Sequence, residues 1–226
     1  MDRVLGTPEV SARRAMVCHG LYGRVLEIGF GTGLNLSHYP AEVTEIFVVE
    51  PSESAMRLAE PRAAAVSATL KHVGRDGARL DLADGSVDCA LSTYTLCTIP
   101  AVDMALSEIH RVLKPDGELH FLEHGRAPTE SVRRWQHRLH PVHSRIAGGC
   151  QLDRPIDDLI IGSGLIMYEL ETGYGDGARP FSYLFRGRAL RPTLEEAFAH
   201  GAGGVLEGSE DAAGAILQAR RVVGLA

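Results

Sequence analysis

Short runs of apolar residues alternate along this chain with longer segments whose apolar residues recur at helical spacing. Continuous apolar runs bounded by turn residues predict buried strands, and recurrence every three or four residues predicts amphipathic helices. Strands are expected over residues 25–28, 45–50, 69–73, 87–93, 118–123, 165–172 and 180–188. Helices are expected over residues 8–19, 34–39, 52–61, 102–113 and 153–161. This alternation predicts an α/β fold with a mainly parallel sheet, to which the last two strands add an antiparallel edge.

A glycine-rich turn follows the first expected strand, in the stretch Arg-Val-Leu-Glu-Ile-Gly-Phe-Gly-Thr-Gly of residues 24–33. Glycine permits positive φ and close approach of a ligand to the backbone, so Gly29, Gly31 and Gly33 are expected to bind a ligand. A dinucleotide site of the type Gly-x-Gly-x-x-Gly would need a glycine where this chain has Leu34. The spacing therefore disfavours NAD, and a turn that binds no nucleotide is the other alternative.

Two glutamates accompany this turn. Glu27 lies inside the first strand, and Glu50 ends the second strand, about 20 residues beyond the glycines. A carboxylate at position 27 would repel a pyrophosphate but could accept hydrogen bonds from a ligand ammonium group. Glu50 is placed to accept hydrogen bonds from both hydroxyls of a ribose. The two acids together predict a zwitterionic ligand that contains a nucleoside.

The third and fourth strands deliver further candidate ligand contacts to the same edge of the sheet. Asp76 and Gly77 follow the third strand, where Asp76 could accept a hydrogen bond from an adenine amino group. Asp-Gly is also a common turn dipeptide, and this alternative stays open. The fourth strand ends in Thr93, Tyr94 and Thr95, which are expected to face the reacting centre.

Composition and charge narrow the class of partner. With 226 residues, 45% hydrophobic and 23% charged, the chain can form one large globular domain, and its net charge of −6 argues against nucleic acid as a partner. The chain has no run of about 18 uncharged apolar residues and no signal peptide, so a cytoplasmic location without a membrane partner is expected. The cysteines lack metal-site spacing and are expected to be free thiols: Cys18, Cys89, Cys97 and Cys150.

The segment 128–150 is rich in basic residues and is expected to form a lid over the substrate. It contains Arg133, Arg134, Arg138 and Arg145, together with His137, His140 and His143. Pro141 is expected to break the helix between two of these histidines, and a closed metal site would need a fourth ligand, so no metal is expected. Two other interpretations are a solvated basic helix with Trp135 packed beneath it and a basic rim for an anionic or lipid-like substrate.

These motifs, in this order, resemble the class I S-adenosylmethionine-dependent methyltransferases over roughly residues 25–188. The matching stretches are residues 26–33, 84–88 and 111–117. Within that superfamily, residues 96–97, 121–124 and 149–152 look like the methyltransferase-like thiol S-methyltransferases and their bacterial relatives. Compared with these families, Phe30 replaces a smaller residue, Asp116 replaces a second glycine, and the animal relatives' N-terminal hydrophobic anchor is absent.

The resemblance implies a Rossmann-like three-layer sandwich whose seven-stranded sheet has a reversed last strand. It also implies that S-adenosylmethionine is bound by Glu27, Gly29, Gly31, Gly33, Glu50 and Asp76. Around this domain of residues 25–190, residues 1–24 are expected to form an N-terminal helical segment. Residues 191–226 are expected to form an Ala/Gly-rich helical tail, which could pack on the body or mediate a homodimer.

The expected activity is in-line methyl transfer to a small-molecule thiol, phenol or amine. The protein then has to align donor and nucleophile and exclude water, and a thiol acceptor needs only a modest base. His124, at the end of the fifth strand, is the candidate base, and Tyr94 is expected to position the acceptor. His124 could equally be a structural residue. The alternatives in function are an NAD-linked oxidoreductase and a non-catalytic cofactor-binding partner protein.

Overall fold

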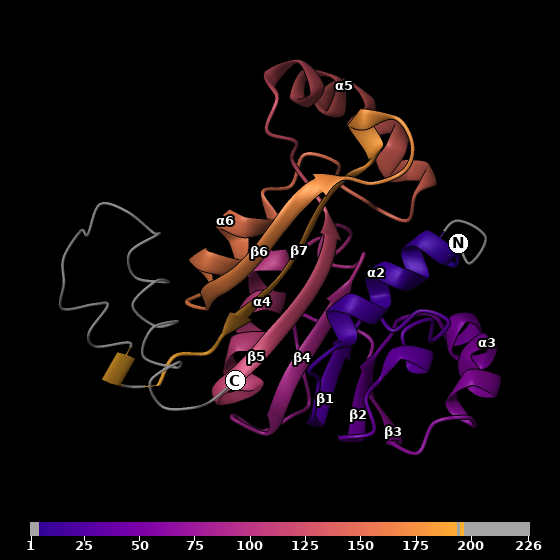
Figure 1. Ribbon diagram of the computed structural model, residues 1–226, viewed down its shortest axis with the longest axis vertical. Coiled ribbons are helices and arrows are strands. Elements are labelled where there is room, and N and C mark those ends of the chain that lie inside the picture. The colour runs from indigo at the N-terminus through magenta and orange to yellow at the C-terminus, as the bar shows by residue number, and fades with distance from the viewer. Residues whose placement is uncertain (1–4, 194, 197–226) are drawn as a thin grey trace.

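The computed structural model describes residues 5–193 and 195–196, which form a single seven-stranded sheet in the order β3-β2-β1-β4-β5-β7-β6 (Figure 1). Its strands are β1 (Gly23–Ile28), β2 (Val43–Val49), β3 (Thr69–Gly74), β4 (Val87–Thr93), β5 (Leu113–His124), β6 (Ile166–Tyr174) and β7 (Tyr183–Leu190). Strands β1 to β5 pair in parallel, whereas β7 runs antiparallel to both β5 and β6. The predicted mostly parallel sheet is confirmed, and its antiparallel edge is the β6–β7 pair.

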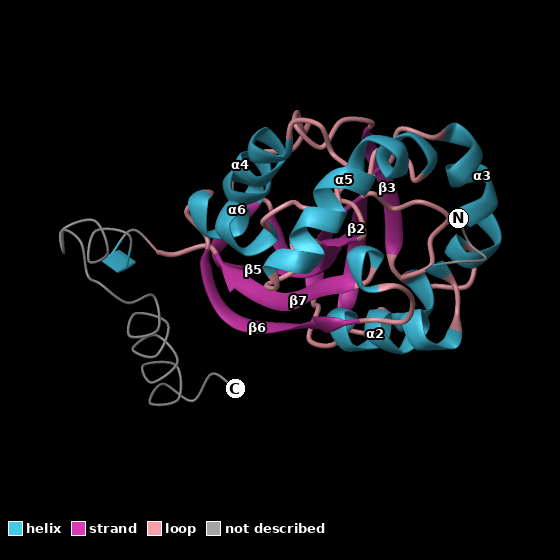
Figure 2. Cartoon of the chain, turned by 90° about the horizontal axis from the view of Figure 1, so that it is seen from above, coloured by secondary structure: helices cyan, strands magenta, loops and turns pink. Residues whose placement is uncertain are grey.

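Helices cover both faces of this sheet (Figure 2). They are α2 (Pro8–Cys18), α3 (Glu53–Ala63), α4 (Val102–Val112), α5 (Glu130–Ile146) and α6 (Ile156–Gly162), with short 3₁₀ helices η1 (Leu36–His38) and η2 (Arg179–Phe181). One hydrophobic core includes Leu106 of α4 and Ile160 of α6, and the other includes Val17 of α2 and Ala59 of α3. This arrangement confirms the three-layer sandwich, because each sheet face buries its own apolar set.

Side-chain caps define where two of the helices begin. The hydroxyl of Thr7 accepts a hydrogen bond from the Val10 amide at the start of α2, and Ser52 accepts one from the Ala55 amide at the start of α3. Each cap satisfies one of the amides that a helix leaves without a partner in its first turn. The helices therefore begin at Pro8 and Glu53, within one residue of the predicted starts.

Two expectations about helices are wrong. The helix expected from residue 34 is only the single turn η1, because Asn35 directs its side chain inward and residue 40 is a proline. Pro141 does not break the basic segment, since it lies inside the 17-residue helix α5. A proline removes only one backbone donor, and α5 is anchored by the buried side chain of Gln136, which bonds the Ala127 amide and the Gly125 carbonyl.

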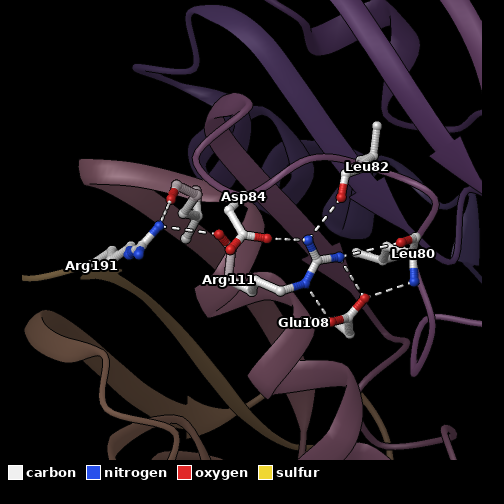
Figure 3. Close-up of polar contacts among 7 residues, drawn as sticks. Leu80, Leu82, Asp84, Glu108, Arg111 and Arg191 are labelled. Atoms are coloured by element: carbon white, nitrogen blue, oxygen red, sulfur yellow. Dashed lines mark hydrogen bonds and ion pairs between the residues drawn. The ribbon is translucent and has the colours of Figure 1, made fainter.

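The connection from β3 to β4 contains no helix, and the side chain of Arg111 holds it in place (Figure 3). Arg111 of α4 forms ion pairs with Glu108 and Asp84, and it donates hydrogen bonds to the carbonyls of Leu80 and Leu82. Glu108 in turn accepts a bond from the Leu80 amide at 2.8 Å. Two of the family-like stretches, residues 84–88 and 111–117, therefore meet in a structural contact.

Two of the departures from the family pattern, at Asp116 and Phe30, have a local explanation. Asp116 has a φ of 62°, a left-handed conformation in which aspartate is better tolerated than most residues, so it can stand where glycine is usual. Phe30 is 3% exposed and packs in the core with Leu36 and Ala59. Its ring therefore fills the layer beneath the glycine turn.

The outermost strand of the sheet carries cross-strand ion pairs. Glu169 of β6 lies 3.3 Å from Arg188 of β7, and Glu169 and Glu171 both pair with Arg186. In the described part of the chain, β6 pairs with β7 alone. The sheet thus ends on a strand whose charges are already matched by its neighbour.

Among the described residues, no helix combines the length and the apolar character that crossing a membrane requires. The four cysteines are buried free thiols, as predicted. The tail helix expected over residues 209–223 lies outside the described residues, as does most of the one expected over 193–200.

Candidate active site

The glycine turn after β1 is bent by three left-handed residues. Gly29, Gly31 and Gly33 have φ values of 74°, 58° and 74°. A Cβ at Gly29 would lie 2.0 Å from Oγ1 of Thr95, so the chain itself occupies that side. A Cβ at Gly31 would meet nothing nearer than a carbonyl oxygen 4.0 Å away. The turn therefore presents bare backbone to open space at Gly31, as a ligand cradle requires.

Glu50 ties this turn to the end of β2. Its carboxylate accepts hydrogen bonds from the amides of Gly31 at 2.7 Å and Ser52 at 2.8 Å, one on each oxygen. A carboxylate oxygen can accept two hydrogen bonds, so each still has capacity for a ribose hydroxyl. The sequence predicted that Glu50 lies beside the turn. In the structure, its carboxylate also holds the turn through these hydrogen bonds. Hydrogen bonding of Glu50 to a ribose stays a prediction.

Glu27 lies at the centre of a buried polar network that extends to α2. It accepts hydrogen bonds from Asn35 and from the hydroxyl of Tyr39, both at 2.7 Å. Arg14 of α2 donates to Asn35 and to Oγ1 of Thr93, both at 2.8 Å. Burial raises the pKa of Glu27 to about 7, against the hydrogen bonds from Tyr39 and Asn35 that lower it. A positive ligand group would be the missing partner for this carboxylate; that role stays a prediction.

Sequence reasoning did not identify Arg14, Asn35 and Tyr39 as part of the site. Arg14 is 5% exposed although it lies on a helix of low overall hydrophobicity. A buried arginine cannot be recognised from local pattern, because the pattern of α2 shows only which positions could face the sheet. The network also places Thr93 as an acceptor for Arg14 and Asn35, so its hydroxyl is engaged inside the protein.

Stability should respond to the titration of Glu27. An unfolded glutamate titrates near 4.5 and the folded one at about 7, so the folded state binds the proton more tightly and loses stability as pH rises between these values. At roughly 1.4 kcal/mol per pKa unit, the loss approaches about 3 kcal/mol. Urea unfolding of ligand-free protein at several pH values should show this decline in the wild type and not in Glu27→Gln. Parallel pH profiles for the two proteins would contradict the assignment.

Asp76 forms a turn at the end of β3. Its carboxylate accepts a hydrogen bond from the Ala78 amide at 2.9 Å, which is the turn that the Asp-Gly pair favours. A Cβ at the buried Gly77 would lie 3.2 Å from Ile28, the last residue of β1. The pair therefore lies next to the carboxyl end of β1, and contact of Asp76 with adenine remains a prediction.

Tyr94 and His124 lie side by side at the ends of β4 and β5. Their ring centroids are 5.0 Å apart, and the guanidinium of Arg14 lies 5.4 Å from the Tyr94 ring centre. Tyr94 adopts a φ of 55°, a strained conformation for a tyrosine that recurs at functional sites. Burial raises the pKa of its phenol, so Tyr94 stays neutral. It is thus suited to position a substrate by a hydrogen bond.

These two rings line a cleft of ≈ 690 Å³ between α2 and the β6–β7 connection. Its wall includes Val10 and Arg13 of α2, and Arg13 lies 3.5 Å from Asp176 on the opposite side. The expected lid is corrected here: of the residues of α5, only His143 lines this cleft. The side chains of Arg133, Arg134 and Arg138 line a separate surface depression.

Several side chains of α5 on the side of this depression have partners within the protein. Trp135 is 54% exposed, so the interpretation that packs it beneath the helix is wrong, and Arg138 lies over its ring. His137 and His140 each approach Asp153, at 3.6 and 3.5 Å. The third histidine of the helix, His143, instead forms a hydrogen bond with Cys150.

Glu123 organises the loop that follows β4. This fully buried carboxylate accepts hydrogen bonds from the Ser92 hydroxyl at 2.7 Å, the Thr95 amide at 3.0 Å and the Cys97 amide at 3.2 Å. Burial raises its pKa, and the hydrogen bonds oppose that rise. Glu123 thereby fixes the backbone that carries Tyr94 on one side and Cys97 on the other.

Cys97 and Cys150 form a coupled pair of thiols beside His124. Their mutual hydrogen bond and burial raise the pKa of Cys97, whereas the hydrogen bonds from Cys97, His124 and His143 lower that of Cys150. The environment of Cys150 therefore favours its thiolate more than that of Cys97 does. The proximity of Cys97 and Cys150 could not be predicted from the sequence, because 53 positions separate them and no local spacing links them.

Comparison with known proteins shows which proteins the chain is similar to. The model of the family described as methyltransferase domain matches residues 26–121. Thiol S-methyltransferase TMT1B of Rattus norvegicus is 34% identical over 136 residues, covering 58% of this chain and 54% of the relative. Over these residues the chain is therefore similar to methyltransferases. The matches favour neither the NAD-linked nor the non-catalytic alternative.

Other methyltransferases share parts of the sequence or the fold. Phosphatidylethanolamine N-methyltransferase of Cereibacter sphaeroides is 29% identical, covering 54% of this chain and 62% of the relative. A structure of a putative methyltransferase from Bacillus halodurans superposes with a TM-score of 0.65 at 14% identity, covering 81% of this chain and 99% of that chain. The chain spans about half the length of the thiol S-methyltransferases that it matches.

Proposed function

We propose that this protein transfers the methyl group of S-adenosylmethionine to a small-molecule acceptor, with a thiol as the best-supported acceptor class. The observation that carries the proposal is the Glu50 carboxylate bonded to the Gly31 amide, on a turn that is open toward a ligand. The relatives at 31–34% identity named as thiol S-methyltransferases support the acceptor class. The rest of the proposal concerns the work of this chain's own residues.

The residues around the turn match the parts of the cofactor. Gly29, Gly31 and Gly33 supply a backbone surface without side chains, and Glu50 would accept from the ribose hydroxyls. The buried Glu27 would balance the ammonium group, with Asn35 as its fixed neighbour, while Asp76, Gly77 and Thr93 would bound the adenine and amino acid ends. When bound, the cofactor supplies an activated methyl group on a positively charged sulfur.

The cleft beside Tyr94 and His124 would receive the acceptor. Its wall combines apolar side chains such as Val10 and Leu184 with these two polar rings and with the charged pair of Arg13 and Asp176. Such a wall suits an apolar molecule with one nucleophilic atom, since apolar surface excludes water while a few polar groups orient the reacting end. Tyr94 would position the acceptor, and His124 would help to remove its proton.

Two measurements test this function. Calorimetry should show micromolar binding of S-adenosylmethionine or its demethylated product, and the protein should consume S-adenosylmethionine with a panel of thiols, phenols and amines. Thiols are expected to be the best acceptors, because their pKa lies nearest neutrality. Absence of cofactor binding would refute the function, whereas turnover with amines alone would refute the acceptor class.

A matched pair of glycine variants distinguishes an effect on cofactor binding from an effect on folding. Gly31→Ala places a methyl group in open space, so it should cost the fold only about 1 kcal/mol for the left-handed backbone while weakening cofactor binding at least about tenfold. Gly29→Ala would place its Cβ 2.0 Å from Thr95, so it should destabilise the fold severely. Thermal unfolding and calorimetry distinguish the two effects; unchanged cofactor affinity in folded Gly31→Ala protein would place the ligand elsewhere.

A further inference from the structure

Two thiols and an imidazole from separate parts of the chain converge beside the acceptor cleft. The sulfur atoms of Cys97 and Cys150 and a ring nitrogen of His124 all lie within 4.8 Å of one another. Both cysteines are buried, and His124 is partly exposed. Over residues 5–193 and 195–196, this is the one group of three such side chains that could share a metal ion.

Backbone contacts hold the three ligands in place. The Gln151 amide donates a 2.9 Å hydrogen bond to the Cys97 carbonyl, which joins the loop after β4 to the loop after α5. Gly149 precedes Cys150 with a φ of 90°, and a Cβ there would lie 3.3 Å from the Thr98 carbonyl. The close approach of the two loops thus depends on a glycine next to Cys150. The two sulfurs are thus brought together by hydrogen-bonded, closely packed backbone, and support of this kind preorganises metal ligands.

We propose that Cys97, His124 and Cys150 bind a thiophilic divalent cation, with Zn²⁺ as the best match. Tetrahedral zinc at ordinary bond lengths separates its sulfur and nitrogen ligands by roughly 3.5–3.8 Å, so the observed cluster needs little rearrangement. Two thiolates neutralise the charge of the cation, and a neutral complex avoids the cost of an unpaired buried charge. Sulfur and imidazole ligands also exclude Mg²⁺ and Ca²⁺, which prefer oxygen.

The fourth coordination position would face the cleft. His124 lines the cleft together with Tyr94, whereas the two cysteines lie behind it. His143 lines the same cleft and contacts Cys150, so it closes that side of the cluster without being within reach of all three ligands. Three protein ligands with one open position are typical of catalytic zinc, whereas structural zinc has four protein ligands.

The open position suggests how a thiol acceptor would be activated, a step that rests on the proposed function. The acceptor sulfur would bind the cation and release its proton to solvent in the cleft, because a coordinating thiol is deprotonated. Its electron pair would form the new carbon–sulfur bond to the methyl group. The bond from that methyl group to the cofactor sulfonium would break, and its electron pair would stay on the sulfur of S-adenosylhomocysteine. In the metal-loaded protein, His124 would act as a neutral ligand, and the cation would replace it as the group that promotes loss of the thiol proton.

Metal binding can be measured without turnover. Reduced protein, freed of metal and dialysed against Zn²⁺, should retain an equimolar amount by elemental mass spectrometry, and Co²⁺ should give a thiolate-to-metal charge-transfer band. Cys97→Ala, Cys150→Ala and His124→Ala should each weaken Co²⁺ binding by roughly 100-fold or more, since loss of even an outer partner costs 10- to 100-fold. Cys18→Ala and Cys89→Ala remove buried thiols elsewhere and should bind Co²⁺ like the wild type.

The outcomes separate this inference from the proposed function. The proposed metal site would be overturned by absence of the Co²⁺ band or by the same band in all five variants. A disulfide between Cys97 and Cys150 that persists in metal-free protein after treatment with a reductant would also overturn it. Circular dichroism identifies any variant that fails to fold, and His124→Ala then decides in place of a cysteine variant. Benzenethiol added without cofactor should shift the Co²⁺ spectrum, and an unchanged spectrum would overturn the open position. Thiol methylation by metal-free protein would overturn the activation step and leave the methyltransferase function standing, whereas Co²⁺ binding without cofactor binding would do the reverse.

Discussion

Replacing Glu50 with alanine is expected to weaken S-adenosylmethionine binding by roughly 100- to 1,000-fold, which corresponds to about 3–4 kcal/mol. Two losses combine in this variant. The ribose would lose a charged acceptor, and hydrogen bonds to charged groups contribute about 1.5–3 kcal/mol each. The turn would also lose the 2.7 Å bond from the Gly31 amide to Glu50, which fixes the position of the cradle. Isothermal titration with S-adenosylmethionine measures the effect directly.

A nearby carboxylate provides the control for Glu50. Glu53 lies at the start of α3, exposed and paired with Arg75, so Glu53→Ala removes the same charge without touching the turn. Its cofactor affinity should stay within about twofold of the wild type, because exposed ion pairs contribute little. Equal affinities for Glu50→Ala and wild type, or equal losses in both variants, would show that Glu50 does not contact the cofactor.

Replacing Glu123 with alanine is expected to lower the free energy of unfolding by roughly 3–5 kcal/mol, because each buried donor left without a partner costs about 1–3 kcal/mol. The variant would leave the Ser92 hydroxyl and the amides of Thr95 and Cys97 unsatisfied in a closed interior. Urea denaturation gives the change in free energy. If the variant is isolated in a folded state, it should also lose the Co²⁺ band, since this loop carries Cys97.

The conservative variant tests the reason for this loss. Glu123→Gln keeps one acceptor oxygen but introduces donors that face other donors, so it should retain part of the stability. An intermediate loss is therefore expected, between that of the wild type and that of Glu123→Ala. Alanine and glutamine variants as stable as the wild type would show that the loop does not depend on this carboxylate.

The strands and the glycine turn could be predicted because their signals are local. Apolar runs such as residues 25–28 and 87–93 become buried strands whatever their neighbours are, and only glycine adopts the turn of residues 29–33 without strain. Glu50 was predictable for a similar reason, since parallel strands end at the same edge of a sheet. The cofactor half of the candidate site was therefore accessible from the sequence.

The acceptor half was less accessible because it depends on long-range contacts. Arg14 reaches Thr93 across 79 positions, and Cys150 meets Cys97 only after α5 has folded back over the strand ends. Proline at position 141 was a misleading local signal, since tertiary anchoring through Gln136 outweighs the loss of one helical hydrogen bond. Convergence of this kind leaves no trace in residue spacing.

The ion pairs on the outermost strand affect how copies of this molecule behave in concentrated solution. The unpaired backbone N–H and C=O groups of an edge strand can pair with a strand of another molecule and so begin edge-to-edge aggregation. Here, Glu169 and Glu171 reach back to Arg186 and Arg188, so an incoming strand would have to strip water from matched charges before it could dock. High protein concentration alone is thus expected to cause little aggregation by strand addition at β6.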